Sequence, residues 1–278
     1  MANGKGETMH YTWLSRVGCL TLCSGAVFMA PYVSAPRELH TDQFDRAPLD
    51  PSWTFLAPDG GSYEIRDGWV HITSPGLRNP MAWDGDRAGW PVSPLLLIEP
   101  PEEDVFTFET RLRFQKRAHW AHAGLVATRK DHASRMILSY YPTLADGVVV
   151  LDWRVGVGTE GAGNVGVGPT GDVWLRVELP RDMPLTQPRF FYRRGGGEES
   201  WTLATKRGGA RPFELPNNLD PRFLPGEYWI GLFATGGLVE EADEEVVAFD
   251  YFHSPEMAPL TVEPGATAAT VWASLRRR

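Results

Sequence analysis

Short stretches in which apolar and polar residues alternate dominate the chain from Thr41 onward. In Thr107–Phe114 (TFETRLRF) the apolar and the charged residues fall on opposite sides of an extended chain, which predicts a half-buried β-strand. Similar patterns predict strands at Gly68–Thr73, Ala123–Thr128, Met136–Tyr141, Val148–Val155, Val173–Leu179, Arg189–Arg194, Trp201–Thr205, Tyr228–Ala234 and Val246–Phe252.

Turn residues separate these stretches, at Asp59–Gly61, Asp146-Gly147, Gly195–Gly197 and Gly208-Gly209. No stretch of this region keeps a helical period over about ten residues. Many short strands at hairpin spacing predict an all-β protein in which two antiparallel sheets form a sandwich.

The composition narrows the class of protein without identifying its function. The 278 residues include 11 Trp, 29 Gly and 23 Pro, which favours a turn-rich β protein with aromatic surfaces. The formal net charge of −8 argues against a nucleic-acid partner held by phosphate contacts. Nothing indicates a multi-pass membrane protein or an integral membrane partner.

The first 35 residues have the pattern of a secretory leader. Arg16 precedes a nearly uncharged stretch, Val17–Met29, and Val33–Ala35 provides a small-x-small exit. We therefore expect a signal peptide over residues 1–35 and a secreted or extracytoplasmic protein, with an N-terminal anchor or a buried segment as the alternatives. Both cysteines, Cys19 and Cys23, lie in this leader, so no disulfide framework is expected in the remainder. Residues 255–278 are expected to form a tail.

Several motifs, in order, are similar to one known family. They are Asp42-x-Phe44-Asp45, Leu49-x-x-x-Trp53, Gly68–Ile72, Phe106–Leu112, Ala123–Val126, Tyr228–Ala234 and Ala248–Phe252. Together, over residues 41–254, they resemble the concanavalin A-like sandwich at the C-terminus of family 43 β-xylosidases and related stand-alone modules.

The resemblance implies a jelly-roll whose concave face meets carbohydrate in many relatives. It does not imply hydrolysis, because in the xylosidases the catalytic carboxylates belong to a separate propeller domain. The residues outside the matched region are too few for a propeller, so no catalytic propeller is expected in this sequence.

Three other motifs are interpreted as structural. The G-x-G-x-x-G match at Gly156–Gly161 is followed by a strand rather than a helix, so we expect a flexible loop and no nucleotide cofactor. Glu241–Glu245 contains E-x-D-x-E, but its many acids are typical of a solvated hairpin tip rather than of a catalytic strand. His119, His122 and His132 lack a fixed carboxylate partner, and a loop is favoured over a zinc site.

A structural calcium ion is expected from the resemblance. Relatives with this jelly-roll often join the first and last strands through Ca²⁺, and Asp45 and Asp250 occupy the matching positions. Oxygen ligands suit that ion. The alternative is that Asp45 caps a turn and Asp250 faces solvent.

The tryptophans divide by their neighbours in the sequence. Trp53, Trp69, Trp174 and Trp229 lie in apolar strand contexts and are assigned to the core. Polar or turn residues flank the remaining candidates, whose indoles could stack on the apolar faces of sugar rings. The candidate ligand-binding residues are Trp83, Trp90, Trp120, His122, Arg129, Tyr141, Trp153 and Arg154, with Arg111 and Arg113 as further candidates for a polar rim.

These observations lead to one hypothesis and two alternatives. The hypothesis is an exported sandwich that binds a glycan, such as a plant or cell-wall polysaccharide, without chemistry of its own. The first alternative is a glycoside hydrolase or polysaccharide lyase on the same fold. The second is a module for protein–protein interaction.

Overall fold

The computed structural model describes residues 41–57, 60–75, 93–116, 121–131, 134–142, 147–155, 158–168, 171–181, 186–195, 200–205, 211–213, 215, 228–236 and 244–257. For residues 154, 155 and 158–164 it describes the backbone alone. The predicted leader and the C-terminal tail from residue 258 on lie outside the described residues. Within the described ranges, no helix combines the length and the hydropathy that crossing a bilayer requires.

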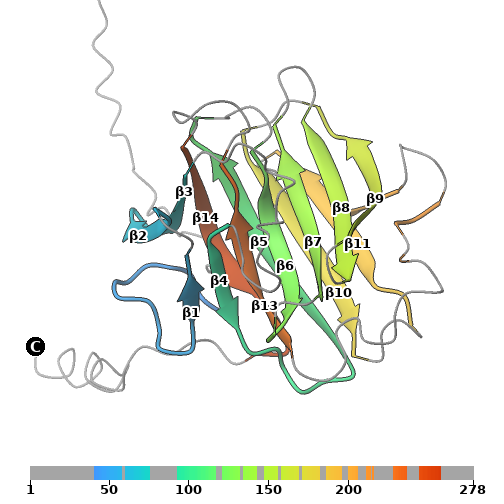
Figure 1. Ribbon diagram of the computed structural model, residues 1–278, viewed down its shortest axis with the longest axis horizontal. Coiled ribbons are helices and arrows are strands. Elements are labelled where there is room, and N and C mark those ends of the chain that lie inside the picture. Colours follow the sequence, from blue (N-terminus) through green and yellow to red (C-terminus); the bar gives the residue numbers. More distant parts are fainter. Residues whose placement is uncertain are drawn as a thin grey trace, which may run out of the picture. The chain divides into compact units, whose positions relative to one another are not determined.

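In these residues fourteen strands form two seven-stranded antiparallel sheets (Figure 1). The strands are β1 (Thr54–Leu56), β2 (Ser62–Arg66), β3 (Trp69–Ser74), β4 (Leu95–Ile98), β5 (Val105–Phe114), β6 (Ala123–Arg129), β7 (Ser134–Tyr141), β8 (Val148–Val155), β9 (Gly158–Gly166), β10 (Val173–Pro180), β11 (Arg189–Arg194), β12 (Thr202–Leu203), β13 (Tyr228–Ala234) and β14 (Glu245–His253). The front sheet has the order β1-β4-β13-β6-β7-β8-β9, and the back sheet has the order β12-β11-β10-β5-β14-β3-β2. The prediction of a two-sheet antiparallel sandwich is confirmed.

The core lies between the two sheets. Phe106 and Phe108 of β5 and Phe249 of β14 are fully buried on the inner face of the back sheet. Leu125 of β6 and Leu232 of β13 are buried on the inner face of the front sheet. Burying one such side chain stabilises the fold by roughly 1.5–3 kcal/mol, so the alternating pattern is the main source of stability.

Trp153 belongs to this core, and its assignment to a ligand-binding face is corrected here. Its side chain is 5% exposed, and it lies opposite Met136 of β7, which is also a core residue. Strand β8 alternates, so Leu151 and Trp153 point inward while Asp152 points outward. Asp152, one of the polar neighbours that favoured exposure, occupies the other face of the same strand.

The glycine-rich stretch that was expected to be a flexible loop contains strand β9. Its backbone pairs with β8 from Val148↔Gly166 to Val155↔Gly158, with one register shift between Leu151 and Asp152. A ladder uses backbone N–H and C=O groups, which glycine supplies as well as any residue except proline. The prediction of a loop is therefore wrong for Gly158–Gly166.

The first described residues are held directly on the last strand. Asp42 and Phe252 exchange two backbone hydrogen bonds of 2.9 Å, and Thr41 Oγ1 donates to the carbonyl of Ser254 at 2.9 Å. The Asp42 carboxylate accepts a 2.8 Å hydrogen bond from Trp53 Nε1, and burial raises the pKa of Asp42. Trp53 in turn packs edge-on against Phe252, with ring centroids 5.1 Å apart, so the core assignment of Trp53 is correct.

We expect Trp153→Ala to lower the free energy of unfolding by about 3–5 kcal/mol, because it leaves a cavity between the sheets. Trp201→Ala is the matched control. Trp201 is half-buried beside β12, and its loss is expected to cost about 1–2 kcal/mol, because each of its two cation–π contacts contributes about 0.5–1 kcal/mol at a partly exposed site. Urea denaturation monitored by circular dichroism measures both values, and equal losses for the two variants would contradict the inward assignment of Trp153.

Candidate functional site

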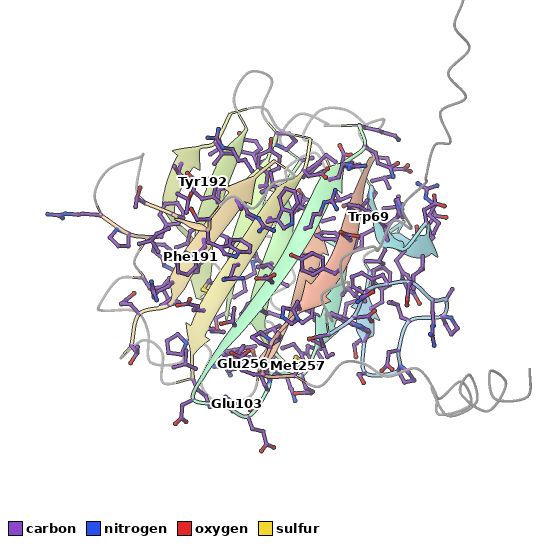
Figure 2. The ribbon with its side chains drawn as sticks, turned by 180° about the vertical axis from the view of Figure 1, so that it is seen from behind. Trp69, Glu103, Phe191, Tyr192, Glu256 and Met257 are labelled. Carbon is purple, nitrogen blue, oxygen red and sulfur yellow. The ribbon has the colours of Figure 1, made fainter. Side chains whose placement is uncertain are left out.

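One row of alternating tryptophan and arginine side chains crosses the outer face of the back sheet, the sheet nearer the viewer in Figure 2. We call it the Trp–Arg row, and it consists of Trp201, Arg193, Trp174, Arg111 and Trp69. Trp174 of β10 lies directly opposite Arg193 of β11 and Arg111 of β5 in the ladder. Trp201 immediately precedes β12, and Trp69, labelled in Figure 2, begins β3. Residues far apart in sequence therefore meet because antiparallel pairing brings their strands together.

Each arginine of the row contacts two indoles. The Cζ atom of Arg111 lies 5.0 Å from the ring centroid of Trp69 and 5.1 Å from that of Trp174. The Cζ atom of Arg193 lies 4.9 Å from the centroid of Trp174 and 5.1 Å from that of Trp201. Such cation–π contacts stabilise by about 0.5–2 kcal/mol each, and four of them in sequence hold the row together.

Two aspartates hold the arginines of β5. Arg111 donates through Nε to Asp172 at 2.9 Å and through Nη1 to Asp250 at 3.0 Å. Arg113 donates to both oxygens of Asp172, at 2.5 and 2.9 Å. Burial would raise the pKa of Asp172, but the hydrogen bonds from Arg113 and Arg111 outweigh burial and hold the pKa below its usual value.

A β-bulge accompanies the second aspartate. The register between β5 and β14 shifts between Phe249 and Tyr251, so Asp250 has no partner in that ladder. Bulges redirect side chains locally. Here the displaced residue is the one whose carboxylate reaches Arg111.

A second set of contacts lies beside the row. Arg176 of β10 donates to Glu109 at 2.5 Å, and the hydroxyl of Tyr251 donates to the other oxygen of Glu109 at 3.1 Å. The guanidinium of Arg176 also lies over Trp201, at 4.1 Å. Burial, together with the negative charge of Glu109, raises the pKa of Tyr251 well above its ordinary value, so Tyr251 remains a neutral donor.

The outer face of the front sheet is different in character. Its middle is a buried apolar cluster that includes Leu95, Leu97, Val126, Ile137 and Phe233. Thus the charged and aromatic side chains that combine into one continuous arrangement lie on the back sheet.

Two predicted site residues do meet on the front sheet. The rings of His122 and Tyr141 stack, with centroids 4.5 Å apart and planes 12° apart. Thr235 holds the backbone of His122, since its N–H donates to the carbonyl at 2.7 Å and its Oγ1 accepts from the N–H at 2.8 Å. Burial lowers the pKa of His122 to about 4, so the imidazole is neutral at neutral pH.

A second titratable pair lies on the same face. Burial raises the pKa of Asp152 to about 6, with nearby Arg135 acting in the opposite direction, and burial lowers the pKa of Arg135 to about 9. Glycoside hydrolysis requires two carboxyl groups on either side of a bond, whereas the charged neighbour of Asp152 here is a guanidinium.

The structure does not gather the remaining predicted ligand-binding residues into one site. Arg129 lies at the opposite end of β6 from His122, about 23 Å away along the strand, and pairs with Asp131 at 2.6 and 3.0 Å. Trp153 is in the core. Trp83, Trp90 and Trp120 lie outside the described residues, as do His119, His132 and the side chain of Arg154.

The two expected calcium ligands have different surroundings. The side chain of Asp45 is 54% exposed beside Arg46, whereas Asp250 is paired with Arg111. Across the described ranges, no three His, Cys, Asp or Glu side chains group closely enough to hold a metal ion. Calcium at these positions stays a prediction.

Three tryptophans that were assigned to the core lie on outer faces, and among them Trp174 is buried there, with 7% of its surface exposed. Trp69 and Trp174 belong to the Trp–Arg row, and Trp229 lies on the front sheet, where its Nε1 donates to Glu99 at 3.0 Å. The alternation of side chains along a strand is the sequence feature that could have placed Trp69 and Trp174 on the outer face. Trp174 lies on the same face of β10 as Arg176 and on the opposite face from Leu175, so alternation along the strand places it on the charged face.

The acidic stretch 241–245 ends in a residue with a structural role. Glu245 is fully buried, and its Oε1 accepts hydrogen bonds from the backbone N–H of Lys116 at 2.9 Å and of Val246 at 3.1 Å. Glu244 pairs with the side chain of Lys116 at 3.4 Å. Glu241 and Asp243 lie outside the described residues.

The two seven-stranded antiparallel sheets form a concanavalin A-like sandwich. A family model described as the β-xylosidase C-terminal concanavalin A-like domain matches residues 41–254, and the chain belongs to this family. The resemblance seen in the sequence is thus confirmed. A search of curated protein sequences found no match.

Solved structures of family 43 glycoside hydrolases share the fold. The match to BlXynB from Bacillus licheniformis has 14% sequence identity and a TM-score of 0.56. It includes 81% of this chain but only 40% of the length of BlXynB. The match to xylan β-1,4-xylosidase from Bacillus halodurans C-125 has 16% identity and a TM-score of 0.55, and it includes 77% of this chain and 38% of the xylosidase. The match to the Bacteroides ovatus protein named xyloglucan PUL GH43B has 17% identity and a TM-score of 0.55, and it includes 81% of this chain and 40% of that protein. At these identities the likeness concerns the fold.

We expect the contribution of His122 to stability to be lost as the pH drops from about 6.5 to about 4, because the unfolded chain then protonates His122 while the folded chain does not. The contribution is fully present above pH 6.5. His122→Phe keeps a ring on Tyr141 but removes the titration, so its loss of Tm between pH 7 and pH 4.5 should be smaller than that of the wild type. Thermal denaturation across this range measures the difference, and identical profiles would contradict the assignment.

Proposed function

We propose that this protein is a carbohydrate-binding sandwich without chemistry of its own, and that its glycan binds on the Trp–Arg row of the back sheet. The matched family is named for β-xylosidases, and similar structures carry names that include xylan and xyloglucan. These names support a glycan as the ligand.

The observation that carries the proposal is the composition of the row and its flanks. Sugar rings present apolar C–H faces and edges that pack on indoles, while their hydroxyl groups need donors and acceptors. Trp69 and Trp201 are half-buried and keep part of their surface open to such a ring. Arg113, whose side chain is 50% exposed, and Asp172 add a donor and an acceptor beside them.

The same contacts hold the binding groups in place before a ligand arrives. Arg111 is fixed by two carboxylates and two indoles, so little of its freedom remains to be lost on binding. Preorganised side chains bind with a smaller entropic cost than free ones. A face that is held rigid in this way is suited to recognition.

The carboxylates of this face are poor candidates for acid catalysis. Asp172, Asp250 and Glu109 each accept hydrogen bonds from a guanidinium group, so their oxygens already have partners. A general acid needs a pKa near the working pH, and the pKa of Asp172 is shifted in the opposite direction. This supports binding without hydrolysis.

Export is also part of the proposal. The basic, apolar and small-residue pattern of residues 1–35 supports it, because this is the order found in secretory leaders. A protein released in this way would meet the polysaccharides that its family name implies.

We expect Trp201→Ala to weaken retention in polysaccharide-containing native gels by about tenfold, because it removes an indole that contacts two guanidinium groups. The gels should contain xylan, arabinoxylan, xyloglucan and β-glucan. Trp229→Ala, on the front sheet, is the matched control and should leave retention unchanged.

Wild-type protein that migrates freely in all four gels would overturn the assignment to these glycans. Equal weakening by the two substitutions would overturn the assignment to the back sheet. The same polysaccharides should release no reducing ends, and their release would contradict the absence of catalysis.

A structural Ca²⁺ at Asp45 and Asp250 remains a separate proposal, supported by the family resemblance alone. The guanidinium of Arg111, 3.0 Å from Asp250, already provides a positive charge there. If the ion is bound, excess EDTA should lower Tm, because a ligand that binds only the folded state stabilises it. An unchanged Tm would remove the proposal, and Asp250→Asn should abolish any response.

A further inference from the structure

The charged groups around the Trp–Arg row do not balance. Two arginines of β5 share Asp172 and Asp250, and Arg176 is paired with Glu109. Among the described side chains no carboxylate pairs with Arg193. Four cations therefore face three anions on this part of the back sheet, and Arg193 is the cation left over.

Arg193 lies in an aromatic slot. Its guanidinium contacts the indoles of Trp174 and Trp201, which lie on the neighbouring strand β10 and just before β12. Its Nε is closed off from solvent and has no hydrogen-bond partner among the residues that the structure describes. The residue as a whole is only half-buried, so we expect a ligand to approach the two terminal nitrogens.

We propose that Arg193 binds the carboxylate of a uronic acid residue in the glycan. This inference rests on the proposed function and specifies its ligand. The two terminal N–H groups of a guanidinium match the two oxygens of a carboxylate, and such bidentate pairs are short and strong. The indoles on either side would then contact the ring of the same sugar.

The surroundings favour a carboxylate over other anions. A carboxylate is planar and extends the plane of the guanidinium, whereas a tetrahedral sulfate or phosphate also places oxygens outside that plane, beside the indoles' apolar surfaces rather than the N–H groups. A phosphate with two charges would also be repelled by Asp172, Asp250 and Glu109. The surplus of one positive charge matches a single negative charge.

The charge of the whole chain points in the same direction. At a formal net charge of −8, the protein repels dense polyanions at long range. A uronate carried at intervals on a largely neutral polysaccharide avoids this repulsion and still offers one charge at contact distance. We therefore expect a glycan with scattered uronic acids to bind better than a sulfated polymer.

The test compares each acidic polysaccharide with its own carboxyl-reduced form, made by carbodiimide activation and borohydride reduction. Glucuronoxylan, polygalacturonate and hyaluronan are the probes, and dextran sulfate is the contrasting polyanion. Isothermal titration calorimetry with the full chain should show at least tenfold tighter binding to one acidic form than to its reduced form.

Arg193→Gln should lose this preference and bind both forms as the wild type binds the reduced one. Arg193→Lys keeps the positive charge but lacks the two parallel N–H groups of a guanidinium, and it should retain only part of the wild-type preference. Arg129→Gln, which alters an arginine paired with Asp131 on the front sheet, is the matched control and should retain the preference.

The outcomes separate the inference from the proposed function. Equal binding of the acidic and reduced forms overturns the uronate assignment while the glycan proposal stands. Binding to no polysaccharide overturns both, and tightest binding to dextran sulfate shows that charge alone decides. If Arg193→Gln lowers Tm strongly, Arg193→Lys tests the same position, and a preference equal to that of the wild type would overturn the role of Arg193.

Discussion

The cross-strand register of β5, β10 and β11 is the constraint on which the rest of the structure depends. On the inner side, this register places Val177 opposite both Phe108 and Phe190, within the core. On the outer side, it places Trp174 between Arg111 and Arg193. A slip of one residue would exchange the two faces of a strand. The core and the Trp–Arg row are therefore specified together, and the hydrophobic effect that fixes one also aligns the other.

The alternating pattern was enough to predict the fold and part of the candidate site. It identified the two-sheet sandwich, and it placed Arg111 and Arg113 together on a polar face because both lie two residues apart on one strand. The ordered motifs over residues 41–254, one of which contains Trp53, also led to the correct family. These successes concern properties that a single strand carries by itself.

The predictions that failed either depend on how strands pair with one another or gave too much weight to the neighbouring residues in the sequence. Trp69 and Trp174 were assigned to the core because their neighbours are apolar, although phase alone puts them outside. Trp153 was assigned to a surface because its neighbours are charged. The contact of Asp250 with Arg111 involves a bulge in the β5–β14 ladder, which no pattern within β14 reveals. Strand β9 (Gly158–Gly166) has no alternating apolar pattern in its sequence, and its backbone pairing with β8 was therefore not predicted.

The same register explains how a face so rich in charge can be selective. Three of the four arginines are neutralised by carboxylates in contact with them, so the face as a whole has little long-range field. Attraction at a distance then contributes little to binding, and selectivity must come from groups at contact distance whose positions are fixed. The carboxylates that pair with these arginines also set their geometry, and the indoles limit how far each guanidinium can turn. In such a layer a cation that no described carboxylate pairs with is a specific feature, because the other three arginines have carboxylate partners.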